Sequence, residues 1–197
     1  MIEVTLKVSH NLYASTLPCL VGVKEGKETV EQGLREQAKF LKGLGVATET
    51  IPFGGGAGGA TSDRVTPRAA VKLLEAMDKR PEGKAFFDAL PVLGVDGTLA
   101  EVVPADSPAR GKVRAKTGTL VWFDALNDRF LLQSKALAGD LVTKSGDRLF
   151  FAMFVNDVPL PRGVSSTREG KVLGKLCEVI HETAVVGEKK KAEKSEK

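Results

Sequence analysis

The stretch Val113-Arg114-Ala115-Lys116-Thr117-Gly118-Thr119-Leu120-Val121-Trp122 decides how the rest of the chain must be arranged. Its alternating residue types and β-branched side chains predict a strand. Further on, Leu141–Thr143 and Leu149–Val155 flank Ser145-Gly146-Asp147, which is typical of a β-hairpin. Together these segments predict the core of an antiparallel sheet.

Helices are expected on both sides of this strand cluster. Apolar residues recur at helical spacing from Leu12 to Leu20, from Val30 to Leu41, from Pro67 to Met77, around Phe86 to Leu90, and from Val172 to Ile180. The predicted fold class is therefore α/β of the α+β type, an antiparallel sheet flanked by helices.

Local signals refine these boundaries. Two capping boxes, Thr29 with Gln32 and Ser166 with Glu169, mark the starts of two helices. Pro18 is expected to kink or shorten the first helix. Thr48–Phe53 is short, partly β-branched and stopped by glycines, which predicts an additional strand.

Length and composition predict one globular domain. The chain has 197 residues, of which 42% are hydrophobic and 27% charged, so it can bury a real core. The net charge of +4 would suggest a nucleic-acid partner, but several lysines lie in the low-complexity, mixed-sign terminal run. We therefore expect a domain over residues 1–185, a disordered Lys/Glu-rich tail over 186–197, and no nucleic-acid partner.

The cysteines and the N-terminal stretch indicate little about compartment. Cys19 and Cys177 are too few for a disulfide framework and have no metal-ligand spacing. Met1–Val8 lacks a basic region followed by a long apolar run, and no segment approaches the roughly 18 apolar residues of a membrane span. No export signal is expected in this chain.

Two short motifs carry the chemistry, Ser9-His10-Asn11 and Lys116-Thr117-Gly118-Thr119. They correspond to two of the three active-site elements of penicillin-interacting serine enzymes. The third element, Ser-x-x-Lys, is absent, since no serine is followed three places on by a lysine. That pair must sit one helical turn apart for the amine to activate the hydroxyl. The sequence therefore predicts most of an active site without its nucleophile.

A wider set of segments resembles a known family. In order and spacing, the chain resembles the D-Ala-D-Ala carboxypeptidase/endopeptidases among the class C low-molecular-mass penicillin-binding proteins, over roughly residues 3–184. The segments that carry this resemblance are Val8–Ala14, Val65–Ala69, Leu90–Leu99 and Ala115–Leu120. In that family the catalytic serine and lysine lie far upstream of the Ser-x-Asn element. The resemblance implies the C-terminal part of such an enzyme, with a partial penicillin-binding-protein/β-lactamase-like transpeptidase fold.

The resemblance also implies roles for the motif residues. Ser9 would relay a proton to the departing nitrogen, and Asn11 would hydrogen-bond the substrate amide. Lys116 would place positive charge near that relay and, with Thr117 and Thr119, hold the substrate carboxylate. The Thr119 N–H would form half of the oxyanion hole. Gly118 would allow a ligand to lie against the strand.

Strand geometry sets a condition on these roles. Alternation sends Lys116 and Thr117 to opposite faces of the sheet, so both can serve one site only if the strand borders that site edge-on.

The resemblance further implies substrates and a compartment. The complete enzyme would cleave peptidoglycan stem peptides ending in D-Ala-D-Ala through an acyl-enzyme, be acylated by β-lactams, and work in the periplasm or cell envelope. No metal or organic cofactor is implied. The missing N-terminal segment would be a partner, and this chain alone would be nearly inert.

Other interpretations stay open at this stage. Ser9 and Asn11 could simply cap a helix, and Lys116–Gly118 could be an ordinary strand end. Gly54, Gly56 and Gly59 satisfy G-x-G-x-x-G, although the next helix begins too late for a dinucleotide site. The chain could also be a non-catalytic module that binds D-Ala-terminated peptides, or a basic nucleic-acid binder that uses its lysine tail.

Overall fold

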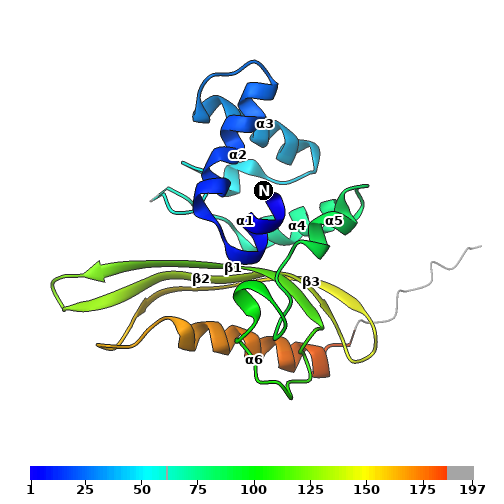
Figure 1. Ribbon diagram of the computed structural model, residues 1–197, viewed down its shortest axis with the longest axis vertical. Helices are drawn as coiled ribbons and strands as arrows, with labels where there is room; N and C mark the ends of the chain where they lie inside the picture. Colours follow the sequence, from blue (N-terminus) through cyan, green and yellow to red (C-terminus); the bar gives the residue numbers. More distant parts are fainter. Residues whose placement is uncertain (61, 186–197) are drawn as a thin grey trace, which may run out of the picture.

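Three long antiparallel strands organise the computed structural model, which describes residues 1–60 and 62–185 (Figure 1). They are β1 (Val113–Asp124), β2 (Arg129–Val142) and β3 (Arg148–Pro159), and they lie in the order β1-β2-β3. In the register, Lys116 stands opposite Ala138, which stands opposite Ala152. The predicted antiparallel sheet flanked by helices is confirmed. The predicted tail, 186–197, lies outside the described residues.

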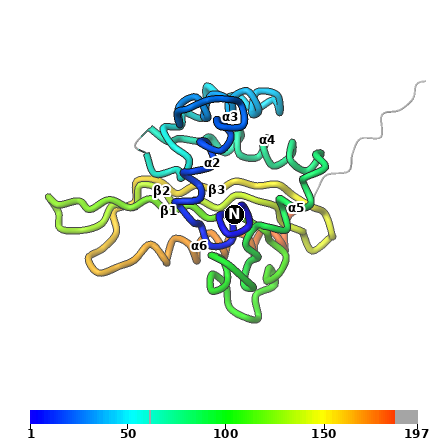
Figure 2. The backbone as a smooth tube through the Cα atoms, turned by 45° about the horizontal axis from the view of Figure 1, so that its top comes forward, coloured from blue at the N-terminus to red at the C-terminus, as the bar shows by residue number. Residues whose placement is uncertain are grey.

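Helices cover both faces of this sheet (Figure 1). α6 (Thr167–Thr183) lies on one face. The other face carries α1 (Ile2–Val8), α2 (Asn11–Lys24), α3 (Val30–Gly43), α4 (Pro67–Asp78) and α5 (Gly83–Asp88). Two 3₁₀ turns, η1 (Thr48–Thr50) and η2 (Gly97–Leu99), lie in the connections. Figure 2 shows that α3 lies farthest from the sheet.

The main core lies between the sheet and α6. Val113, Ala115 and Leu141 are fully buried there, against Leu173 and Cys177 of α6. Since side chains alternate along a strand, the side chain of Lys116 points to the opposite face, toward α1 and α2. Smaller apolar clusters hold α3 to α4 and α4 to α5.

Asp140 ties the three strands to the upper helices. Its carboxylate is nearly fully buried and accepts hydrogen bonds from Arg114 of β1 at 2.6 Å and Arg148 of β3 at 2.6 Å. The same two arginines reach Asp88 of α5 and Asp78 of α4. One buried carboxylate thus joins both outer strands and, through its arginines, two helices.

Several local predictions need correction. Thr48–Phe53 is not a strand, because its first residues form η1 and Ile51 packs beside α3 and α4. Ser166 begins α6 without a side-chain cap, so that capping box is wrong, whereas the one at Thr29 is confirmed. Pro18 does not shorten α2, which continues to Lys24.

Glycines allow close contact around α2. A Cβ on Gly33 of α3 would lie 1.9 Å from the Pro18 carbonyl oxygen, and one on Gly56 would lie 2.3 Å from the Ala14 oxygen. The Asp63 carboxylate fixes the glycine-rich connection by accepting the N–H groups of Gly54 and Ala60. This run is therefore the irregular connection that the sequence predicts, packed against α2.

We expect Asp140→Asn to reduce the free energy of unfolding by about 3 kcal/mol, because two partly buried arginines lose their shared counter-charge. Urea denaturation followed by circular dichroism measures this change. Asp106→Asn, at an exposed position, is the control and should change stability little. Equal midpoints for the two variants would show that the Asp140 pairs do not hold the sheet together.

Candidate active site

Ser9 lies at the junction between α1 and α2 in an uncommon backbone conformation. Its φ of 58° and ψ of 51° place it in the left-handed region, which is unfavourable for a non-glycine residue and concentrates at functional sites. The N-cap of α2 is His10, whose Nδ1 accepts the Tyr13 N–H at 3.3 Å. The Ser9 hydroxyl is therefore not used to cap the helix.

Lys116 meets Ser9 directly. Its Nζ donates to Ser9 Oγ at 2.7 Å and to the Thr117 carbonyl oxygen at 2.6 Å. The two motifs that the sequence singles out thus form one polar cluster where the α1–α2 junction crosses β1. Asn11 stands in the first turn of α2, is exposed, and makes no hydrogen bond through its amide to another described residue.

The segment Leu90–Leu99 holds the Ser9 turn in place. Lys7, at the end of α1, donates to the Leu90 carbonyl oxygen at 2.7 Å and to Asp96 Oδ2 at 2.6 Å. The other oxygen of Asp96 accepts the Val92 N–H at 2.7 Å. Gly97 has a φ of 55°, and a Cβ there would lie 2.5 Å from the Lys7 carbonyl oxygen. This packing explains the glycine in the Asp-Gly-Thr sequence.

The edge of β1 is covered up to Ala115 and open beyond it. Leu93 donates its N–H to the Val113 carbonyl oxygen at 3.0 Å, and Ala115 donates to the Pro91 oxygen at 2.9 Å. Backbone groups alternate in direction, so the N–H groups of Thr117 and Thr119 also point to this outer side. Among residues 1–60 and 62–185, no strand pairs with the outer edge of β1 beyond this point. The condition that the strand borders the site edge-on is met.

The threonine side chains lie on the face opposite Lys116. Thr117 Oγ1 donates to Thr98 Oγ1 at 2.8 Å, and Thr119 Oγ1 accepts from Lys135 Nζ at 2.9 Å. Between them, Gly118 leaves the upper face open, since a Cβ there would meet only Ala136 Cβ, at 3.4 Å. Each threonine hydroxyl is therefore held in place beside the free edge.

Burial lowers the pKa of Lys116 to about 8. The cause is desolvation, because the ammonium leaves water and no described carboxylate lies within ion-pair distance of it. An amine that titrates near neutral pH can both donate and accept a proton under physiological conditions. With Ser9 Oγ as its hydrogen-bond partner, Lys116 can pass a proton through that hydroxyl.

Sequence reasoning assigned no role to Thr98 or Lys135. Thr98 lies within the Leu90–Leu99 segment, and its place beside Thr117 depends on the packing of η2. Lys135 stands opposite Thr119 in the register of β1 and β2. The sequence pattern predicts only the end of β2 and not its beginning at Arg129, so it does not place Lys135 opposite Thr119.

The Ser9–Lys116 site does not lie in the large cavity beside α6. A cavity of about 620 Å³ lies between α6 and the Val102–Pro104 segment, and no residue of the two motifs lines it.

In the described part of the chain, no helix combines the length and the apolar character needed to cross a membrane.

Comparison with known proteins identifies the family. A model of the D-Ala-D-Ala carboxypeptidase 3 (S13) family matches residues 1–172. A search of the curated proteins finds no match.

Solved structures share the fold. Penicillin binding protein 4 from Haemophilus influenzae superposes with a TM-score of 0.75 at 20% identity, over 92% of this chain and 39% of that one. A predatory endopeptidase from Bdellovibrio bacteriovorus, solved with an immunity protein, gives 0.64 at 24% identity, over 91% and 42%. An extended-spectrum β-lactamase gives 0.62 at 18%, over 91% and 61%. The chain thus spans about two fifths of the length of the first two, and the expected penicillin-binding-protein/β-lactamase-like fold is confirmed.

We expect the Lys116 side chain to titrate near pH 8, well below the ordinary lysine value of about 10.4. NMR of isotope-labelled lysine side chains measures the midpoint. In Ser9→Ala the midpoint should fall further, because the charged form loses an acceptor. Ser15→Ala, an exposed serine of α2, should leave it unchanged. A Lys116 midpoint above pH 10 would rule out the buried, desolvated ammonium.

Proposed function

The chain belongs to the D-Ala-D-Ala carboxypeptidase 3 (S13) family, and on this premise we propose that it forms the substrate-binding part of a serine-type D-Ala-D-Ala carboxypeptidase/endopeptidase acting on peptidoglycan in the cell envelope. Residues 1–185 would be the C-terminal portion of its peptidase domain. The nucleophile would come from a separate Ser-x-x-Lys segment, since none of the 197 residues provides that motif. The complete site would be acylated by β-lactams.

One observation carries this proposal. The Lys116 ammonium and the Ser9 hydroxyl, 2.7 Å apart, stand beside a strand edge whose outer N–H groups, from Thr117 onward, pair with no strand in the described part of the chain. A positive charge next to free N–H groups suits a peptide that ends in a carboxylate and adds to the sheet as an extra strand. An arginine or lysine in an ordinary surface ion pair would not stand beside free backbone N–H groups.

In the proposed reaction, the substrate carboxylate binds Lys116 together with the Thr117 and Thr119 hydroxyls, and the Thr117 hydroxyl turns its hydrogen from Thr98 Oγ1 to the carboxylate. The Thr119 N–H points outward, where it donates to the oxygen of the scissile carbonyl as negative charge develops. The serine of the separate segment attacks the carbonyl carbon and forms an ester while the C–N bond breaks. The hydroxyl proton of the attacking serine passes to the departing nitrogen through Ser9, and water later hydrolyses the ester.

Asn11 has a supporting role in this proposal. It follows Ser9 by two residues and begins α2 with its amide free of hydrogen bonds to described residues. An amide group can donate and accept at once, which matches both partners of a peptide bond. We therefore assign Asn11 to the substrate amide.

The structure offers surface for the separate segment. The outer edge of β3 pairs with no strand among the described residues, and Val8 and Leu12, on either side of the Ser9 turn, are 59% and 66% exposed. Open strand edges and exposed apolar side chains favour association with further polypeptide. A helix carrying the nucleophile would cover Val8 and Leu12 and bring its serine to Lys116.

A second candidate function is a non-catalytic module that binds D-Ala-terminated peptides. It is favoured by the fact that the edge, Lys116 and both threonine hydroxyls are in place within this chain. Losing the nucleophile costs about six orders of magnitude in turnover in another serine hydrolase, while binding groups can remain.

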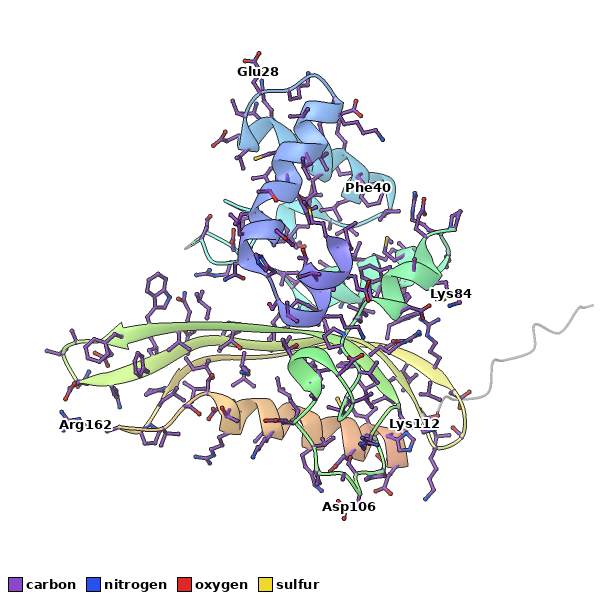
Figure 3. The ribbon with its side chains drawn as sticks, viewed as in Figure 1. Glu28, Phe40, Lys84, Asp106, Lys112 and Arg162 are labelled. Atoms are coloured by element: carbon purple, nitrogen blue, oxygen red, sulfur yellow. The ribbon has the colours of Figure 1, made fainter. Side chains whose placement is uncertain are left out.

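We expect the chain to bind an acetylated peptide ending in D-Ala-D-Ala, and Lys116→Met to weaken that binding about 10- to 100-fold through loss of charge-assisted hydrogen bonds. Isothermal titration calorimetry measures the affinity. Lys112→Met is the matched control, since Figure 3 shows Lys112 on the α6 side of the sheet. Equal affinities for the two variants would contradict the assignment of Lys116 to the carboxylate.

Covalent labelling separates the two functions. The chain alone should not react with a fluorescent penicillin, because it lacks the nucleophile. Co-expression with a Ser-x-x-Lys segment of the same family should restore labelling if the chain is part of an enzyme, and Lys116→Met should abolish it. Peptide binding without restored labelling would favour the module.

We expect Gly118→Ala to fold normally yet bind the same peptide at least about tenfold more weakly. The added methyl group meets Ala136 at ordinary contact distance within the fold, but it lies on the face that the ligand must approach. Thermal melting checks the fold and calorimetry checks the binding. Ser134→Ala, two pairs further along the sheet, serves as the control. Undiminished binding by Gly118→Ala would place the ligand elsewhere.

A further inference from the structure

Trp122 stands on the same strand and the same face as Lys116, near the end of the β1–β2 hairpin. It is the single tryptophan of the chain and is 45% exposed. Figure 1 shows that this end of the hairpin extends beyond the helices that cover the rest of the upper face. Together with Leu126 of the hairpin turn, which is 93% exposed, Trp122 leaves apolar surface uncovered beside the proposed binding edge, and such surface is typical of a ligand site.

The indole is held by its neighbours. Its Nε1 donates to Gln133 Oε1. Gln133 is the extra residue of a bulge, since Leu120 stands opposite Ser134 and Val121 opposite Leu132. Bulges occur beside functional sites, where they redirect a side chain. The amide nitrogen of Gln133 remains a donor next to the ring, so the position combines an apolar face with a polar group.

The length of the strand relates Trp122 to the proposed site. Trp122 follows Lys116 by six positions, which is about 20 Å along a strand. With the substrate carboxylate at Lys116 and the scissile carbonyl at Thr119, an added peptide strand runs toward Trp122 with its amino end leading. An extended pentapeptide covers about 17 Å. The amino end of a stem peptide therefore arrives at Trp122.

In peptidoglycan that amino end is attached to a sugar. We propose that Trp122 is a saccharide platform, on which the sugar that carries the stem peptide stacks its apolar C–H face, with Gln133 as a positioning residue that orients the ring. This inference rests on the proposed function. It adds a subsite for that sugar at the hairpin end, because aromatic rings with adjacent polar groups bind ligands that are partly apolar and partly hydroxylated.

Charges at the hairpin end argue against membrane insertion of the same aromatic. Asp124 pairs with Arg129, and Asp128 in the turn pairs with Arg162, which lies beside the hairpin end in Figure 3. Inserting this end into a bilayer would take these groups out of water at high cost. On the opposite face, Phe123 packs against Phe130 with ring centroids 5.5 Å apart.

The fluorescence of Trp122 tests the proposal without any need for catalysis, because no other tryptophan contributes. Two probes are titrated, an acetylated pentapeptide ending in D-Ala-D-Ala and the same peptide linked to N-acetylmuramic acid. We expect the sugar-linked peptide to bind about five- to tenfold more tightly and to change the Trp122 emission, whereas the free peptide changes it little. Calorimetry measures both affinities independently of fluorescence.

Variants separate this inference from the proposed function. Trp122→Ala should bind both probes with the affinity of the free peptide, and Phe123→Ala, on the opposite face, should retain the preference for the sugar-linked probe. Gln133→Ala should reduce that preference. If neither probe binds the unaltered chain, the proposed function fails. If both bind equally, only the saccharide platform fails. Emission that responds to anionic phospholipid vesicles and not to the sugar-linked probe would overturn the platform in favour of a membrane surface.

Discussion

The hydrogen bond from Lys116 Nζ to Ser9 Oγ joins groups that are 107 residues apart, and the proposed site depends on it. It forms because α1 ends in a left-handed residue, which turns the Ser9 hydroxyl toward β1 while His10 caps the next helix. The ion pair between Lys7 and Asp96 fixes the Ser9 turn, and Gly97 allows the close approach to the Lys7 backbone. Burial of the lysine that this packing causes also lowers its pKa toward neutrality.

A second constraint keeps β1 both rigid and accessible. One face of the strand packs on α6, and Asp140 ties its start to β2 and β3 through two arginines. Pro91–Leu93 covers the outer edge only as far as Ala115. The strand is therefore held firmly on one side and at its beginning, while its outer N–H groups from Thr117 onward pair with no described strand. An edge of this kind is normally a liability, and here it is where the proposed ligand adds to the sheet.

Different positions along β1 are proposed to bind different parts of the ligand. In this proposal Lys116 and the two threonines meet the carboxylate, Gly118 leaves room for the peptide, and Trp122 stands about 20 Å from Lys116 along the strand with its ring positioned by Gln133. The rise per residue of β1 sets the spacing of these positions, so one strand edge can bind both the terminal carboxylate and the sugar of the proposed ligand. In this proposal the lowered pKa of Lys116, about 8, serves the chemistry, whereas Trp122 serves substrate choice.

The sequence by itself determined the fold class, most helices, the capping box at Thr29 and the two motifs of the proposed site, because helical spacing, strand alternation and residue order are local properties. It failed at Thr48–Phe53, where burial of Ile51 overrides β-branched content, and at the beginning of β2, whose pattern is weak. Only the tertiary structure decided that Ser9 faces Lys116, that β1 is an edge strand, and that Thr98 and Lys135 hold the threonines. Those facts depend on contacts between residues far apart in the chain, which no local pattern encodes.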